Sequence, residues 1–320
     1  MNRESPGEPP HPDADHYAAM LLHYYRTLPN FGDALNPWLW HRLLPGHFSP
    51  DDNVVFLGIG TILQAGIPEA SRYVVLGAGS GYGALPAVDS RWEFHAVRGP
   101  LTAAALHLPR EAAVTDAAYL LNLVDLPAAR TGKPIGFMPH WRSLRRIPWR
   151  AICEFAGLRF INPFAPVEQV LAELRGCDRL VTEAMHGAIV ADLLRVPWVP
   201  VRLGDHFLDF KWRDWLAAME VDCTAIPLQP MDPWSEHRPS DGLRMRASRR
   251  AINLLGYYVR SAPLAVQLRT LRKGIETRAQ PVFLSRDAVL QDRLDTLERR
   301  LETVRSALPG ETALRDKAAS

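Results

Sequence analysis

Short apolar runs alternate with helix-like segments along the first part of the chain. Runs that end in glycine occupy residues 54–60, 73–79 and 93–99, and the last leads directly into a helical pattern. Such runs are typical of a parallel sheet whose strands are joined by crossover helices. A similar run at 19–25 begins the series, and residues 115–121, TDAAYLL, close it.

The same rhythm restarts after ARTGK at residues 129–133, which we interpret as a linker. Four further strand-like runs follow, with helical patterns between them, at 134–140, 158–164, 178–187 and 198–203. Two successive halves of this kind predict an α/β fold with two Rossmann-like domains that face a cleft.

The amino-acid composition changes after residue 243, where Arg and Lys are frequent and acidic residues are rare. Further on, apolar residues alternate spacings of four and three, at Leu290, Leu294, Leu297, Leu301, Val304 and Leu308. This heptad seam has two interpretations: a helix that packs its apolar stripe on its own chain, or a short coiled coil that makes a homo-oligomer.

These patterns divide the chain into four predicted parts. A disordered N-terminal tail covers residues 1–17, and two Rossmann-like domains follow at 18–130 and 131–242. A basic helical extension with the short heptad segment completes the chain at 243–320.

The amino-acid composition of the chain excludes some classes of function. With 320 residues and 47% hydrophobic content the chain can bury one large core or two ordinary ones. Because the net charge is only +2, and no helix-turn-helix, zinc-finger or RNP pattern appears, nucleic-acid binding is not indicated. The sparse Cys153, Cys177 and Cys223 fit a reducing cytoplasm. The polar start is no secretory signal and no apolar run suits a membrane span, so we expect a cytoplasmic protein, at most peripheral at the inner membrane face.

A cluster of glycines follows the second glycine-ended run, at Gly77, Gly79, Gly81 and Gly83. A dinucleotide fingerprint starting at the first of them needs glycine where Tyr82 stands, and no P-loop is present either. Two readings remain: a loop whose Gly79, Ser80 and Gly81 approach a ligand closely, or a tight turn that needs positive φ.

Other candidate residues follow predicted strands. Asn30, Gly32 and Asp33 can cap and turn into a helix or, at the cleft edge of the sheet, contact a ligand. Arg98 precedes a helix start, where an anion would meet a guanidinium and a helix N-terminus, although a surface ion pair is the simpler interpretation.

Two histidines, His140 and His186, also end predicted strands, and Lys211 lies among aromatic residues. A lone histidine is usually structural, and the lysine alone is best read as solvated. Together they predict a cleft with cations and a histidine at a helix mouth, without a metal or nucleotide fingerprint. Such a cleft suits a small, doubly charged anion.

Several stretches, in order, resemble the polysaccharide pyruvyltransferase family, and within it the exopolysaccharide (succinoglycan) ketal pyruvyltransferase branch. They are NFGDALNPWLW, VLGAGSGYG, FHAVRGPLTAAAL, TDAAYLL, GFMPHW, INPFAPVEQVLAELRGCDRLVTEAMHGAIVADLLRVPWVPV and FKWRDWL. The resemblance runs from about residue 20 to 220 and rests on the ordered set. The chain departs from it at Thr182, Glu183 and Ala184, where serines are common, and at TDAAYLL, where a Gly-Asp-Pro segment is commoner.

The resemblance implies a GT-B-like fold and transfer of pyruvate from phosphoenolpyruvate to a sugar, as a cyclic ketal. It implies that Arg98 and Lys211 hold the donor's carboxylate and phosphate and that His186, followed by Gly187, is catalytic. We expect an imidazolium at His186 to act as general acid, with Glu183 orienting it, activating a hydroxyl or only capping the helix. No metal or cofactor is expected. The expected acceptor is a sugar of a lipid-linked oligosaccharide or polysaccharide, and the basic extension can touch anionic lipid.

Two alternatives remain open at this stage. A GT-B nucleotide-sugar glycosyltransferase often carries two glutamates eight positions apart, but the eighth position after Glu183 is Ala191. A non-catalytic scaffold of an exopolysaccharide assembly complex is the other alternative, against which Arg98, His186 and Lys211 argue.

Overall fold

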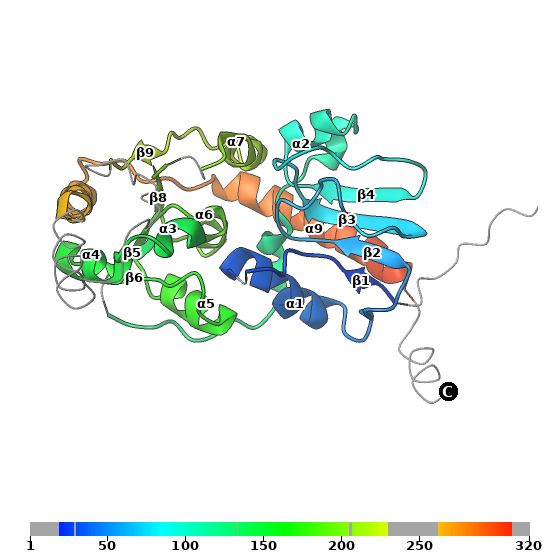
Figure 1. Cartoon of the computed structure of the whole chain (residues 1–320), viewed down its shortest axis with the longest axis horizontal. Helices are drawn as coiled ribbons and strands as arrows, with labels where there is room; N and C mark the ends of the chain where they lie inside the picture. Colours follow the sequence, from blue (N-terminus) through cyan, green and yellow to red (C-terminus); the bar gives the residue numbers. More distant parts are fainter. Residues whose placement is uncertain (1–18, 29, 133, 205–206, 230–261, 309–320) are drawn as a thin grey trace, which may run out of the picture.

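A computed structural model describes residues 19–28, 30–132, 134–204, 207–229 and 262–308 (Figure 1). The predicted tail at 1–17 and the first part of the predicted basic extension lie outside the described residues. The described chain is a mixed α/β structure with two parallel sheets, which confirms the predicted class. The GT-B-like arrangement and the domain boundaries remain predictions.

The first sheet has the order β1-β2-β3-β4 and all its pairings are parallel. Its strands are β1 (Leu21–Leu22), β2 (Val54–Leu57), β3 (Arg72–Ala78) and β4 (Trp92–Val97). Every residue of β2 is buried, as expected for a strand covered on both faces. Helices α1 (Phe31–Leu43) and α2 (Pro100–Ala105) follow β1 and β4. The predicted strand at 19–25 is reduced to the two residues of β1.

The second sheet has the order β6-β5-β7-β8-β9, again parallel throughout. Its strands are β5 (Ile135–Met138), β6 (Arg159–Phe160), β7 (Arg179–Thr182), β8 (Trp198–Arg202) and β9 (Ile226–Pro227). The helices between them are α3 (Trp141–Leu144), α4 (Trp149–Ala156), α5 (Val167–Arg175), α6 (Met185–Leu193) and α7 (Asp209–Ala218). The restart of the apolar rhythm therefore marks a second sheet.

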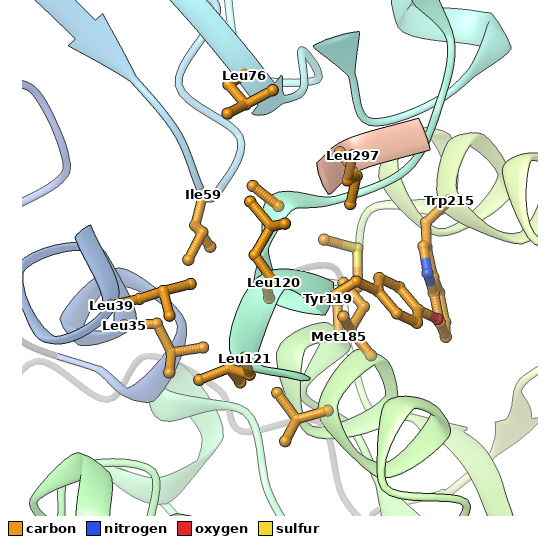
Figure 2. Close-up of a cluster of buried hydrophobic side chains, with 14 of the residues drawn as sticks. Leu35, Leu39, Ile59, Leu76, Tyr119, Leu120, Leu121, Met185, Trp215 and Leu297 are labelled. Carbon is orange, nitrogen blue, oxygen red and sulfur yellow. The ribbon is translucent and has the colours of Figure 1, made fainter. Parts of the chain in front are cut away.

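Between the sheets lies the short 3₁₀ segment η2 (Ala117–Leu123), which follows another, η1 (Arg110–Ala112). Residues 117–121 of η2 are all buried and belong to one core cluster with α1, β3, α6 and α7 (Figure 2). Figure 2 shows Tyr119, Leu120 and Leu121 at the centre of this cluster, with Met185 and Trp215 beside them. The helices of both sheets thus share one apolar core.

The heptad seam lies on α9 (Asp287–Ser306) and just after it. All six of its residues are buried, and α9 packs against β3, β4 and η2 (Figure 1). Of the two interpretations of the seam, the structure shows the helix that packs on its own chain. The stripe is therefore not available for a coiled coil between subunits.

The described part of the C-terminal extension begins beside the second sheet. Residues 262–276 form a helix whose apolar residues share a core cluster with α4. Phe283 then exchanges two backbone hydrogen bonds with Trp198 of β8, at 2.8 and 3.0 Å. The extension thus runs from one sheet to the other.

Candidate functional site

A cavity of about 250 Å³ lies where strands of both sheets end. Its walls come from loops and helix starts after β1, β2 and β3 on one side and after β5 and β7 on the other, with α7 completing it. This is the edge at which open α/β sheets bind ligands. The cavity brings together six of the residues predicted from the sequence: Asn30, Gly32, Asp33, His140, His186 and Lys211.

His186 is the second residue of α6 and is 15% exposed. Ala184, the N-cap of α6, offers no side-chain hydrogen bond within the described chain, and Ala184, Met185 and His186 all line the cavity. The free N–H groups and positive end of the helix dipole at this terminus favour a negative charge.

Gly32 of α1 lies directly against the imidazole of His186. A Cβ at Gly32 would sit 2.1 Å from Nδ1 of His186, so no side chain fits there. Gly32 also lines the cavity, so Nδ1 faces a lining residue, whereas Nε2 is buried. The sequence suggested Gly32 for a sharp turn; its position shows that the close approach of the ring needs glycine.

The other ring nitrogen faces a carboxylate that the sequence reasoning missed. Nε2 of His186 is 3.5 Å from Oδ2 of Asp116, which is fully buried. Asp116 is the N-cap of η2, and its other oxygen, Oδ1, accepts a hydrogen bond from the Ala118 backbone at 3.0 Å. Neither Nε2 nor Oδ2 has a hydrogen-bond partner among the described residues. The signal available in the sequence was the aspartate of TDAAYLL, the segment that closes the first series of predicted strands.

Lys211 supplies a buried cation from α7. Its side chain is 8% exposed, and Nζ donates a hydrogen bond to the Tyr82 hydroxyl at 3.3 Å. Burial first, then repulsion from Arg98, lowers the pKa of Lys211 to about 8, while Asp33 acts in the opposite direction. The lysine is therefore still mostly charged near neutral pH, and poorly compensated.

Asn30 and Asp33 form the start of α1. Asn30 is the N-cap, and its side-chain oxygen accepts from the Asp33 backbone at 3.3 Å, while its amide donates to the Asp33 carboxylate. Burial raises the pKa of Asp33, and the charges of His186 and Lys211 partly oppose that shift. The predicted cap is confirmed, and the same residues also line the cavity.

Arg98 does not line the cavity. It is fully buried, and its guanidinium donates to Oδ2 of Asp214 at 3.1 Å, Oγ1 of Thr61 at 2.8 Å and the Ser80 carbonyl at 2.7 Å. Of these partners Thr61 is itself a lining residue, so Arg98 lies one layer behind the wall. In this geometry the predicted direct grip on an anion is not present. Its charge still reaches Lys211, whose pKa it lowers.

The predicted ligand loop Gly79–Ser80–Gly81 is not part of the cavity wall either. A Cβ at Gly79 would lie 2.3 Å from Cζ of Arg98, so glycine here permits the arginine to pack. The Ser80 N–H donates to Oγ1 of Thr102 at 3.1 Å, and Gly81 has a φ of +149°. Of the two interpretations, the tight turn describes this loop. Gly79 also leaves space for the side chain of Arg98. Gly187 is likewise off the cavity, packed against Thr182.

Glu183 has a different position from the one predicted. It is 2% exposed, does not line the cavity, and its Oε2 accepts from the His140 backbone at 2.9 Å and from Oγ of Ser143 at 2.5 Å. Glu183 thus ties the end of β7 to the start of α3. The carboxylate beside Nε2 of His186 is Asp116, so the expected orienting role of Glu183 is corrected.

The start of α3 adds a histidine and an arginine to the cavity. His140 is the N-cap, and its Nδ1 accepts from the Arg142 backbone at 3.2 Å. Arg142 lines the cavity, is exposed, and has its guanidinium 5.1 Å from the ring centroid of Trp141. We did not single out Arg142 from the sequence, although it stands two residues after His140 at a predicted strand end.

Two searches of the described residues gave negative findings. No group of three or more His, Cys, Asp or Glu in that part of the chain could hold a metal ion. None of the described helices combines the length and apolar character that crossing a membrane requires.

Comparison with known proteins defines the class. The sequence profile of the family "Polysaccharide pyruvyl transferase" matches residues 30–205, which include the cavity residues Asn30, His140 and His186 but not Lys211. The chain belongs to the polysaccharide pyruvyl transferase family. One relative is the succinoglycan biosynthesis protein ExoV of Rhizobium meliloti (strain 1021), 39% identical over 198 residues. The match spans 60% of this chain and 62% of that relative, less than two thirds of its length.

Proposed function

We propose that this protein transfers pyruvate from phosphoenolpyruvate to a sugar of an exopolysaccharide and forms a pyruvate ketal. The observation that carries the proposal is the meeting of His186, Lys211 and Arg142 in one cavity, beside the free N-terminus of α6. Phosphoenolpyruvate carries a phosphate and a carboxylate on three carbons, and cations with helix N–H groups suit both. Family membership and the ExoV relative support the same activity.

His186 is the proposed general acid. A protonated ring transfers its proton to the methylene carbon of the donor, and positive character develops at the neighbouring carbon. A sugar hydroxyl attacks that carbon, phosphate leaves with the C–O bond electrons, and a second hydroxyl closes the ring. Positioned proton transfer of this kind contributes typically about 10²–10⁴-fold to rate. In this proposal the negative charge of the bound donor stabilises the imidazolium of His186, and the N-terminus of α6 stabilises the negative charge of the donor.

Lys211 of α7 and Arg142 of α3 are the proposed direct contacts of the donor. Arg98 acts in this proposal from behind Thr61, through its charge and by fixing the wall. The proposed scheme needs no metal or cofactor, so full activity is expected in the presence of EDTA. Loss of activity that added magnesium restores would contradict this scheme.

The test is incubation of the protein with phosphoenolpyruvate and extracted lipid-linked oligosaccharides. We expect phosphate release together with a product whose mass has grown by one pyruvate ketal. His186→Gln is expected to lose about 10²–10⁴-fold in kcat. His41→Gln, an exposed histidine of α1, is the matched control. Thermal protection by a nucleotide sugar but not by phosphoenolpyruvate would overturn the proposal in favour of a glycosyltransferase.

The proposed acceptor is lipid-linked, which would place the protein as a peripheral partner of the cytoplasmic membrane face. Support comes from the helix at 262–276, where the exposed Arg269 stacks 5.5 Å from the ring centroid of Phe155. Phe155 and Val266 are 56% and 55% exposed. Deletion of the extension is a poor test because α9 completes the core. Flotation with anionic liposomes that Arg269→Glu with Lys273→Glu does not weaken would refute membrane contact.

A further inference from the structure

We propose that Asp116 is the positioning residue that makes His186 a directed proton donor. The inference rests on the proposed function, because it assigns a partner to the proposed acid. Asp116 holds the proton on Nε2 of His186, which leaves Nδ1 as the nitrogen that carries or accepts the transferable proton at the cavity. The pattern is that of a carboxylate that fixes the tautomer of a histidine base.

The two atoms have only each other. Oδ2 of Asp116 and Nε2 of His186 are both buried without a hydrogen bond to any other described residue, and they lie 3.5 Å apart. Buried polar atoms are nearly always paired, and a buried carboxylate without a cation is costly. A protonated ring gives Asp116 both a hydrogen-bond donor at Nε2 and a compensating positive charge. A small rotation of the ring would improve the hydrogen-bond geometry between Nε2 and Oδ2.

The fold separates the two oxygens of Asp116 by task. Oδ1 caps η2 through the Ala118 N–H, so Oδ2 is the oxygen left for the histidine. Gly77 makes this possible on the sheet side: its φ is +89°, and a Cβ there would lie 2.4 Å from the Ala117 nitrogen. The start of η2, and with it Asp116, can therefore approach β3 closely.

A second contact fixes the distance between the two elements. The hydroxyl of Tyr119 in η2 donates to Oδ2 of Asp192 in α6 at 2.8 Å. Asp192 also accepts from the Ser285 backbone and hydroxyl, at 2.8 and 2.6 Å. Because α6 carries both Asp192 and His186, this network holds the imidazole in place against Asp116. Placement of this kind is what proton transfer to carbon requires.

The charged groups near the ring complete the picture. Asp33 of α1 lines the same cavity, where burial raises its pKa and the charges of His186 and Lys211 oppose that shift. After the Nδ1 proton moves to the donor carbon, the ring is neutral. Its remaining proton stays on Nε2, which faces Asp116. Nδ1 can then take the proton released by the attacking sugar hydroxyl, which restores the starting charge.

The test separates charge from shape with Asp116→Asn. This variant retains Oδ1 for the η2 cap but removes the negative charge. We expect kcat to fall about 10²–10⁴-fold with the KM for phosphoenolpyruvate little changed and the urea midpoint preserved. A double variant with His186→Gln should be no slower than His186→Gln alone, because the two residues act as a unit. Asp125→Asn, at an exposed carboxylate just after η2, is the control: it should change neither kcat nor the urea midpoint.

A spectroscopic readout makes the outcome independent of turnover. In ligand-free protein labelled with ¹⁵N-histidine, the ring of His186 should carry its proton on Nε2, and Asp116→Asn should shift the population towards Nδ1. His186→Gln assigns the signal. An unchanged tautomer together with full kcat in Asp116→Asn overturns the inference and leaves the proposed function intact. Wild-type protein with the expected tautomer but no phosphoenolpyruvate-dependent phosphate release overturns the proposed function instead.

Discussion

Two buried carboxylate–cation pairs flank the cavity region, and they are built in opposite ways. In the pair Arg98–Asp214 each partner also has hydrogen bonds to other groups: Asp214 accepts from the Leu101 and Thr102 backbones, both at 2.9 Å. In the pair His186–Asp116 the facing atoms have no other partner among the described residues. The first pair lies behind the wall, and the second reaches the cavity.

The difference indicates what each pair does. A fully hydrogen-bonded buried pair is specific in geometry and costly to break, so it organises structure. An incompletely paired, partly accessible histidine can change its protonation state without the loss of a network, which is what proton transfer needs. The sequence predicted that both Arg98 and His186 belong to the site, and the structure separates them by their partners and by the cavity, which only His186 of the two lines.

The sharpest way to break this comparison is Asp214→Ala. Removal of the carboxylate leaves the Arg98 guanidinium buried and uncompensated, and the N-terminus of α2 loses two acceptors. We expect the free energy of unfolding to drop by about 3–5 kcal/mol, measured by urea denaturation. Asp209→Ala, an exposed carboxylate of the same helix, is expected to change it by less than about 1 kcal/mol. Equal effects of the two variants would show that the Arg98 network is not structural.

Two glycines offer a matched pair of steric tests. Gly79→Ala would push on the Arg98 guanidinium, and we expect a loss of about 1–3 kcal/mol in stability. Gly32→Ala would push on Nδ1 of His186, and we expect kcat to fall by roughly 10²-fold because a displacement of about 1 Å suffices. Urea midpoints and phosphate-release rates should separate the two variants. A Gly32→Ala protein that is mainly destabilised would contradict the assignment.

The pH dependence of Lys211 sharpens the contrast further. Its pKa in the folded chain, about 8, lies below the ordinary lysine pKa of 10.5, so the unfolded chain binds more protons between these values. The free energy of unfolding should therefore rise with pH across that window. Donor affinity should fall over the same range, by up to roughly tenfold per pH unit, as the cation is lost.

Calorimetry with phosphoenolpyruvate and urea denaturation at matched pH values measure both trends. Lys211→Met should remove this contribution to each, and Lys211→Arg should keep its charge and lose the fall in affinity. If wild type and Lys211→Met show the same pH profile of donor binding, the lysine is not a donor contact.

The smallest expected effect belongs to Tyr82→Phe. The hydroxyl of Tyr82 accepts from Nζ of Lys211 at 3.3 Å, a long hydrogen bond. Its removal should weaken donor binding by about 0.5–1.5 kcal/mol, or a few-fold in Kd, with little change in kcat. Tyr73→Phe, far from the cavity lining, serves as control. A large loss of kcat in Tyr82→Phe would give that hydroxyl a chemical role instead.

The sequence predicted where the strands lie because periodicity is a local signal. Several strands end earlier than predicted: β7 ends at Thr182, so His186 lies in α6 and does not end a strand. Since parallel strands end at one edge, Asn30, His140 and His186 could be expected together. Burial and the choice of hydrogen-bond partners are not local properties. The guanidinium of Arg98 donates to Thr61, Ser80 and Asp214, and Asp214 is 116 positions away in the sequence. The same holds for Asp116, whose partner His186 lies 70 positions away on α6. The carboxylate nearer in sequence, Glu183, was therefore the wrong choice to orient the histidine.

The heptad on α9 has a consequence for how the chain is made. Its leucines cover β3 and β4, which precede them by about two hundred positions. During synthesis the early strands therefore emerge long before the helix that shields them, and contacts of such long separation form slowly. A nascent chain that stalls before α9 would present an uncovered apolar surface, so the first sheet is expected to be completed only after α9 has emerged from the ribosome.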